Sequence, residues 1–145
     1  GSATIDALRR LRELGISIAL DDFGIGYSSL TSLEQLPINR VKIDRMLVAG
    51  VDSNPRSAAI VRSIVTLCHG LGLQVVAEGV ERPTQLDFLA HCGPLAIQGF
   101  LLAKPVEAAA ASSEAAAATA RARTLLAAAP TPPLTLVGRK RPQPL

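Results

Sequence analysis

The chain has 145 residues, of which 48% are apolar and 3% aromatic, and this length is typical of one domain but too short for an intact large barrel. Five of its 15 basic residues lie beyond residue 120, where there is no acid, so the earlier part has 10 basic residues against 12 acidic ones. The basic excess therefore belongs to the tail, and the remainder shows no basic, aromatic-rich patch suited to DNA.

The predicted elements begin with an amphipathic helix. Residues 4–14 repeat apolar side chains at helical spacing, and Gly15 is expected to end that helix. The apolar run Ile16–Leu20 then predicts a short buried strand that ends at two acids and a glycine turn. The same alternation continues, with strands expected at 40–44, 74–77 and 95–102, and helices at 55–70 and 83–91.

Apolar strands that alternate with helical segments predict an α/β fold, in which helices cover a parallel sheet of about four strands. We expect this unit to occupy residues 3–107. The alanine-rich residues 108–129 favour a helix with little to pack, and the proline-rich, basic residues 130–145 are typical of a disordered tail. No uncharged apolar run in the sequence is long enough to predict insertion into a membrane.

Polar side chains occur where each predicted strand ends. They are Asp21 and Asp22, Lys42 and Asp44, Glu78, and Gln98. Strand ends meet solvent and acids there often cap helices, so any one of these has an ordinary structural explanation. Four successive strands with this feature point instead to a ligand site, because parallel α/β proteins bind ligands at the carboxyl ends of their strands.

Asp21 and Asp22 are the strongest candidates for ligand-binding residues. Adjacent carboxylates at a buried strand end repel one another unless a cation neutralises them. Carboxylate oxygens suit Mg²⁺, Mn²⁺ or Ca²⁺, and Glu78 would be a third oxygen ligand. Lys42 interrupts an apolar strand, so its burial requires an anionic partner, and an ammonium there could hold a water or stabilise a phosphate oxygen.

The segment GIGYSS (residues 24–29) imitates a dinucleotide-binding turn. It follows a predicted strand and precedes a helix, with Asp44 placed 20 residues after Gly24. The third glycine is missing, and Asp21 and Asp22 would repel a bare pyrophosphate. A bound cation removes the second objection, so the pattern favours phosphate chemistry through cations over dinucleotide binding.

Four stretches together resemble the EAL domain family of cyclic-di-GMP phosphodiesterases. They are LDDFGIGYSSL (20–30), VKIDR (41–45), VVAEGVE (75–81) and IQGFLLAKP (97–105). The resemblance implies a partial TIM-like (β/α) barrel in a cytoplasmic bacterial signalling protein. It also implies hydrolysis of cyclic-di-GMP to linear pGpG with two Mg²⁺ or Mn²⁺ ions.

The resemblance assigns metal and catalytic roles by position. Asp21 and Asp22 match an aspartate pair that binds the metals. Lys42 matches a lysine that contacts the nucleophilic water, and Glu78 matches a glutamate beside the metals. Glu78 is therefore expected to be both a metal ligand and a catalytic residue.

Further positions would bind substrate or support the site. Glu81 matches a second acid, Gln98 matches the glutamine before the last glycine–aromatic pair, and Asp44 closes the VKID stretch. A mobile loop that couples metal binding to dimerisation in the family has Ile25 here in place of the usual threonine. Its other positions are Phe23, Gly24, Gly26, Tyr27, Ser28 and Ser29.

The family's Glu-x-Leu signature, a metal-binding asparagine and a further glutamate belong to earlier strands, before the helix that residues 4–14 resemble. We therefore expect half of the barrel to be absent from this chain. Alone it would be inactive, hold one ion loosely, and form a homodimer or bind a partner that covers the open half-barrel. One alternative is a non-catalytic module that binds protein or cyclic-di-GMP, and another is a small hydrolase assembled across a dimer.

Overall fold

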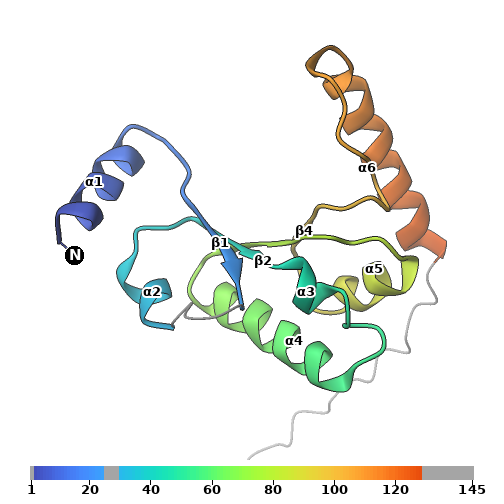
Figure 1. The fold of residues 1–145 in the computed structure, drawn as a ribbon, viewed down its shortest axis with the longest axis horizontal. Coiled ribbons are helices and arrows are strands. Elements are labelled where there is room, and N and C mark those ends of the chain that lie inside the picture. Colours follow the sequence, from blue (N-terminus) through green and yellow to red (C-terminus); the bar gives the residue numbers. More distant parts are fainter. Residues whose placement is uncertain (1, 25–29, 129–145) are drawn as a thin grey trace, which may run out of the picture.

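The computed structural model describes residues 2–24 and 30–128, which form an α/β fold around a four-stranded sheet (Figure 1). The strands lie in chain order and every neighbouring pair is parallel, so the predicted fold class is confirmed. The strands are β1 (Ala19–Phe23), β2 (Arg40–Ile43), β3 (Gln74–Ala77) and β4 (Ala96–Ile97). The helices are α1 (Ser2–Glu13), α2 (Leu30–Gln35), α3 (Arg45–Val48), α4 (Pro55–Gly70), α5 (Pro83–Ala90), the 3-10 turn η1 (Ala108–Ala110) and α6 (Ala111–Ala128).

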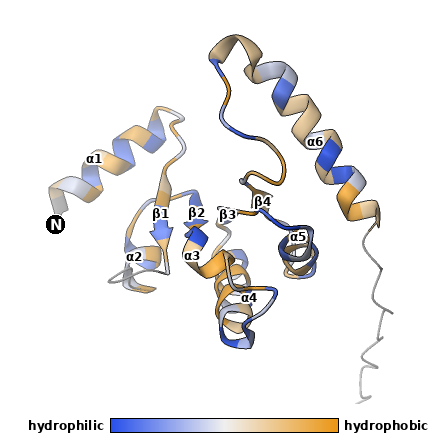
Figure 2. Ribbon diagram, turned by 45° about the vertical axis from the view of Figure 1, so that its right-hand side comes forward, coloured by the Kyte–Doolittle hydropathy of each residue, from blue (hydrophilic) through white to orange (hydrophobic). Residues whose placement is uncertain are grey.

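The hydrophobic core lies between the central strands and the helices α4 and α5, which lie together on one side of the sheet (Figure 2). On β2, Val41 and Ile43 are fully buried, and they pair in register with Val75 and Ala77 of β3. Because successive side chains of a strand point to opposite faces, the intervening Lys42 is directed away from this core. The alternation places the polar residue of β2 on the face that carries the candidate site.

The first strand differs from the prediction in place and in burial. It begins at Ala19 rather than Ile16, and the buried strand expected at residues 16–20 is wrong because Ile16 is 47% exposed and Leu20 only partly buried. The Ile18 amide is already bonded to the Asn39 side chain before the regular ladder starts. β1 is an edge of the described sheet, so no strand there covers its outer side.

The last strand is shorter than the predicted segment 95–102. Only Ala96 and Ile97 pair with β3, and the chain then turns, since the amides of Leu102 and Ala103 both bond to the Gly99 carbonyl. Gly99 makes this turn possible because a Cβ atom there would lie 2.1 Å from the Val80 carbonyl oxygen. A close backbone contact therefore ends the strand, and no pattern of apolar side chains reveals it.

Helix α1 agrees with the predicted amphipathic helix and ends before Gly15, whose φ of 82° allows the turn. Its apolar side does not reach the core, because Leu11 is 40% and Leu14 is 77% exposed. Figure 1 shows α1 beyond the β1 edge, away from α4 and α5. The helix is thus an exposed amphipathic element.

Helix α6 lies at the opposite end of the molecule from α1 (Figures 1 and 2). None of its residues is buried, although Leu125 packs against the core beside α5. Within the described residues, no helix has the length and apolar character needed to cross a membrane. The predicted tail, residues 130–145, lies outside the described residues, and the proposed division of the chain at 107 and 129 stays a prediction.

Candidate metal centre

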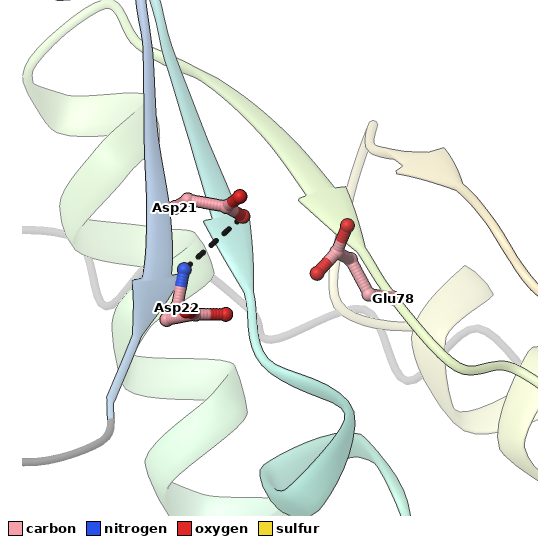
Figure 3. A group of neighbouring side chains, drawn as sticks. All are labelled: Asp21, Asp22 and Glu78. Atoms are coloured by element: carbon pink, nitrogen blue, oxygen red, sulfur yellow. Dashed lines mark hydrogen bonds between the residues drawn. The ribbon is translucent and has the colours of Figure 1, made fainter.

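Three acidic side chains meet at the carboxyl ends of the strands. Asp21 and Asp22 lie on β1, and Glu78 directly follows β3. Their carboxylates face one another across β2 (Figure 3). The sheet thus brings together residues that are up to 57 positions apart in the chain, as expected when parallel strands end at one edge.

A β-bulge allows the side chains of both aspartates to point toward this cluster. The register of β1 against β2 pairs Leu20 with Val41 and Phe23 with Ile43. Two residues of β1, Asp21 and Asp22, therefore lie opposite a single residue of β2, Lys42. In a regular strand, neighbouring side chains point to opposite faces, but the extra residue of a bulge changes that direction. Asp22 takes φ of 51°, the only positive value at a non-glycine residue within the described ranges, and its amide bonds to Asp21 Oδ1 at 3.2 Å.

Lys42 bridges the two sides of the cluster. Its Nζ lies 2.9 Å from Asp21 Oδ1 and 2.5 Å from Glu78 Oε1. Hydrogen bonds to Glu78 first, and then to Asp21, raise the pKa of Lys42, while the Lys42 hydrogen bond is the main cause that lowers the pKa of Asp21. The ammonium therefore stays charged, and at least the Asp21 carboxylate stays ionised, at neutral pH.

The three carboxylates have a spacing that fits one hard cation. One oxygen from each of Asp21, Asp22 and Glu78 lies within 4.8 Å of the other two. Ligand oxygens lie about 2.0–2.6 Å from Mg²⁺ or Ca²⁺, so two oxygens on opposite sides of one ion are about 4–5 Å apart. Asp21 and Asp22 are exposed while Glu78 is mostly buried, so the cluster is open to solvent on the β1 side.

A groove of about 570 Å³ adjoins this cluster and contains the supporting residues expected from the sequence. Glu81 and Gln98 are exposed on its wall. Asp44 also lines it, but its carboxylate accepts a hydrogen bond from the Met46 amide and thereby caps α3. Phe100, another lining residue, is 59% exposed.

Other expected features lie apart from the cluster or outside the described residues. Phe23 is buried and Gly24 has φ of 103°, whereas Gly26, Tyr27, Ser28 and Ser29 lie outside the described residues. A larger groove of about 840 Å³ is lined by residues of α4, α5 and α6 and of the segment before α4, and it contains none of the three clustered carboxylates. Within the described residues, Asp21, Asp22 and Glu78 form the one group that could hold a metal ion, so the groove beside them is the better candidate for chemistry.

Sequence patterns gave no signal for Gln85, Arg82 or Asp52, which brace the loop between β3 and α5. The Arg82 guanidinium donates to Asp52 at 2.7 and 3.0 Å and to the Ala49 carbonyl at 2.7 Å. Gln85 lies inside this connection as a buried amide. Gln85 lies three residues after the N-cap Arg82, which is the position of the Gln in a capping box, but an arginine N-cap is not the Ser or Thr by which that motif is identified in a sequence.

Comparisons with known proteins found a matching family and several relatives. The family described as EAL domain matches residues 1–105. The cyclic di-GMP phosphodiesterase NbdA of Pseudomonas aeruginosa is 46% identical over 109 residues, which are 74% of this chain and 14% of NbdA. The chain spans only part of its relatives' length, for example 27% of the cyclic di-GMP phosphodiesterase RocR of the same organism.

Solved structures show the same arrangement of elements. The EAL domain of Mycobacterium smegmatis DcpA superimposes with a TM-score of 0.73 at 41% identity, covering 81% of this chain and 52% of that one. Klebsiella pneumoniae BlrP1, solved as a manganese and cyclic-di-GMP complex, superimposes with a TM-score of 0.65 at 40% identity, covering 69% of this chain and 26% of that one.

Proposed function

This chain belongs to the EAL domain family, and from that premise we propose that it acts in cyclic-di-GMP signalling as part of a metal-dependent phosphodiesterase site that yields linear pGpG. The observation that carries the proposal is the convergence of Asp21, Asp22 and Glu78 within 4.8 Å, with Lys42 bonded between them. Oxygen ligands can hold the cations that activate water, and a fixed ammonium can stabilise negative charge on a phosphate oxygen, so both suit hydrolysis of a phosphodiester.

Each of these groups has a definite task in the proposed reaction. Asp21, Asp22 and Glu78 would hold Mg²⁺ or Mn²⁺, which when bound supplies charge neutralisation and lowers the pKa of a ligand water. Lys42 is held by two carboxylates, so its ammonium is oriented toward the cluster and can donate a hydrogen bond to the attacking water or to a phosphate oxygen. The adjoining groove, with Glu81, Gln98 and Asp44, would bind the nucleotide.

The first test measures metal binding by the chain itself. We expect titration with Mn²⁺, followed by electron paramagnetic resonance, to show one ion per chain, because one set of three carboxylates is present among the described residues. Asp22→Asn should weaken that binding at least tenfold, while the control Asp6→Asn, which lies on α1 and pairs with Arg9, should leave it unchanged. Equal affinity in both variants would refute the metal assignment.

The second test measures hydrolysis. A two-metal reaction needs a second ion about 3.5–4 Å from the first, so we expect negligible turnover of cyclic-di-GMP by the chain alone. Joining it to the N-terminal portion of an EAL domain should give Mn²⁺-dependent turnover that EDTA abolishes and Lys42→Met reduces at least a hundredfold. Absence of turnover in the joined protein would remove the catalytic proposal.

A second candidate is a non-catalytic module that binds cyclic-di-GMP or a protein. One set of three carboxylates, open to solvent, is present among residues 2–24 and 30–128, and this favours the second candidate because one ion is enough to bind a phosphate but not to complete two-metal hydrolysis. Calorimetry with cyclic-di-GMP in the presence of Mg²⁺ distinguishes a module that binds the nucleotide from one that binds only protein. Heat of binding without turnover in the joined protein supports a nucleotide-binding module, and no heat supports a purely protein-binding one.

A further inference from the structure

Gln85 is the only polar residue that is buried in the part of the chain that the structure describes, with 1% of its surface exposed. Its Oε1 accepts hydrogen bonds from the amides of Glu81 and Arg82, both at 2.9 Å. Its Nε2 donates to the Val48 carbonyl at 3.2 Å. A buried amide that satisfies three backbone groups at once joins the segments that carry them, because leaving any of these groups unpaired is costly.

The two segments joined by Gln85 are those that follow β2 and β3. Val48 ends α3, which begins directly after the β2 end that carries Lys42 and Asp44. Glu81 belongs to the loop from Glu78 to Arg82, which carries the third carboxylate of the cluster. Gln85 therefore lies behind the site and links the strand that bears the ammonium to the loop that bears Glu78 and Glu81.

The rest of that loop is bonded to the neighbouring strands. The Glu78 amide bonds to the Ile43 carbonyl at 3.1 Å, and the Val80 amide bonds to the Gln98 carbonyl at 3.1 Å. Val80 is fully buried, and Gly79 takes φ of 68° against the Arg45 side chain. The loop is therefore held to β2 at Glu78, to the residue after β4 at Val80, and to α5 at Glu81 and Arg82.

We propose that Gln85 is a positioning residue for the metal centre, which holds the β3–α5 loop so that the Glu78 and Glu81 carboxylates face the β2 end. This role rests on the proposed function. Groups that orient metal ligands through hydrogen bonds change metal affinity about 10–100-fold when they are removed. Gln85 would act in this way through the backbone of the loop, without touching the ion or the nucleotide.

Three variants of the full chain separate positioning from general stability. Gln85→Met keeps the side-chain volume but removes all three hydrogen bonds, and we expect it to lower Mn²⁺ affinity about tenfold or more. Gln85→Glu keeps both acceptor contacts to the loop but loses the donor to the Val48 carbonyl, so its Mn²⁺ affinity should lie between those of the parent and Gln85→Met. Leu89→Ala, at a fully buried position on the same helix, should lower the melting temperature while leaving the three Gln85 hydrogen bonds in place, and its Mn²⁺ affinity should remain within threefold of the parent's.

Amide hydrogen exchange tests the same role without any metal. Loss of the Gln85 side chain removes the hydrogen bonds of the Glu81 and Arg82 amides, so faster exchange of these two amides is expected in any case. The informative amides are those of Glu78 and Val80, which are bonded to other residues. We expect both to exchange at least tenfold faster in Gln85→Met, because positioning requires that the whole loop moves together. If these two amides keep the parent's rates, Gln85 only caps α5 and the proposal is wrong.

The outcomes also separate this proposal from the function proposed above. If the unmodified chain fails to bind Mn²⁺, the metal assignment fails, and the exchange rates of Glu78 and Val80 still decide the role of Gln85. A Leu89→Ala loss of affinity equal to that of Gln85→Met overturns the positioning role. If Gln85→Met does not fold, native-state hydrogen exchange of the unmodified chain tests the positioning role. Equal opening free energies for the amides of Glu78, Val80 and Glu81 would support a loop that opens as one unit. Unequal values would refute it.

Discussion

Asp22 combines a left-handed backbone conformation with a position in the candidate metal centre. Its φ of 51° lies in a region that glycine adopts freely, that aspartate and asparagine tolerate, and that other residues enter at a cost. This conformation belongs to the bulge that directs two consecutive carboxylates to one place. The backbone strain therefore accompanies the geometry that the candidate metal centre needs.

The strain at Asp22 is measurable by comparing two substitutions that both remove the carboxylate. We expect Asp22→Gly to be more stable than Asp22→Ala by about 1 kcal/mol, because only alanine resists positive φ. Urea denaturation of both variants gives the difference in the free energy of unfolding. Equal stabilities would mean that the bulge does not constrain this backbone.

Gly99 is a second residue whose identity is required by its surroundings. An added Cβ atom would lie 2.1 Å from the oxygen and 2.3 Å from the nitrogen of Val80, and a backbone contact cannot yield as a flexible side chain would. We expect Gly99→Ala to lower the free energy of unfolding by about 1–3 kcal/mol. Gly70→Ala is the matched control, since nothing lies within 4 Å of its added Cβ, and it should be neutral or slightly stabilising in urea denaturation.

Among the elements, the connection between β3 and α5 is held to the segment after α3 by an ion pair at its surface. Arg82 bonds to both oxygens of Asp52, and Thr84 also donates to Asp52 at 2.5 Å. These two partners, Arg82 first, lower the pKa of Asp52 to about 2. The Asp52 carboxyl is mostly buried while the Arg82 side chain is 46% exposed, so solvent weakens the pair.

This ion pair predicts a definite pH dependence of stability. Since the pKa of Asp52 is lower in the folded chain than the ordinary 3.8, its contribution is complete above about pH 4 and is lost as the pH falls toward 2. We expect Asp52→Asn to lower the free energy of unfolding by about 1–2 kcal/mol at pH 7, after allowance for screening. Chemical denaturation at pH 7, 4 and 2.5 should show the difference shrinking, and a constant difference would contradict the role of the charge.

At the scale of the molecule, apolar surface collects at the β1 edge of the sheet. Leu11 of α1, and Leu14 and Ile16 in the segment between α1 and β1, are 40%, 77% and 47% exposed, and β1 is an outer strand of the described sheet. Exposed apolar patches beside an open strand edge favour association. Dimerisation, which we expect from the sequence, stays a proposal that this surface supports.

Sedimentation velocity over a range of concentrations tests self-association. We expect the chain to form dimers or larger species at micromolar concentrations, and Leu14→Ser with Ile16→Ser to shift the population toward monomer about tenfold. Leu126→Ser serves as the control, because Leu126 is 40% exposed on the distant helix α6. A parent chain that stays monomeric, or a control that dissociates equally, would contradict this assignment of the surface.

Much of the fold follows from short segments of sequence. Gly15 and the repeat in residues 4–14 predict α1 to within two residues, and the runs at 40–44 and 74–77 predict β2 and β3 closely. The short α3 and the early end of β4 escape prediction. The first depends on a cap from Asp44, and the second depends on contact between Gly99 and Val80, which are distant in sequence.

The α/β class, the parallel sheet of about four strands and the residues of the cluster could be inferred from the chain alone, because periodicity and residue type are local properties that a sequence displays directly. The bulge that turns Asp21 and Asp22 to one side, the bonds of Lys42 to both Asp21 and Glu78, and the burial of Gln85 arose only in the folded structure. These features depend on register and packing between segments far apart in the chain. The relative positions of these segments are set by the whole fold, so no single segment of sequence encodes them.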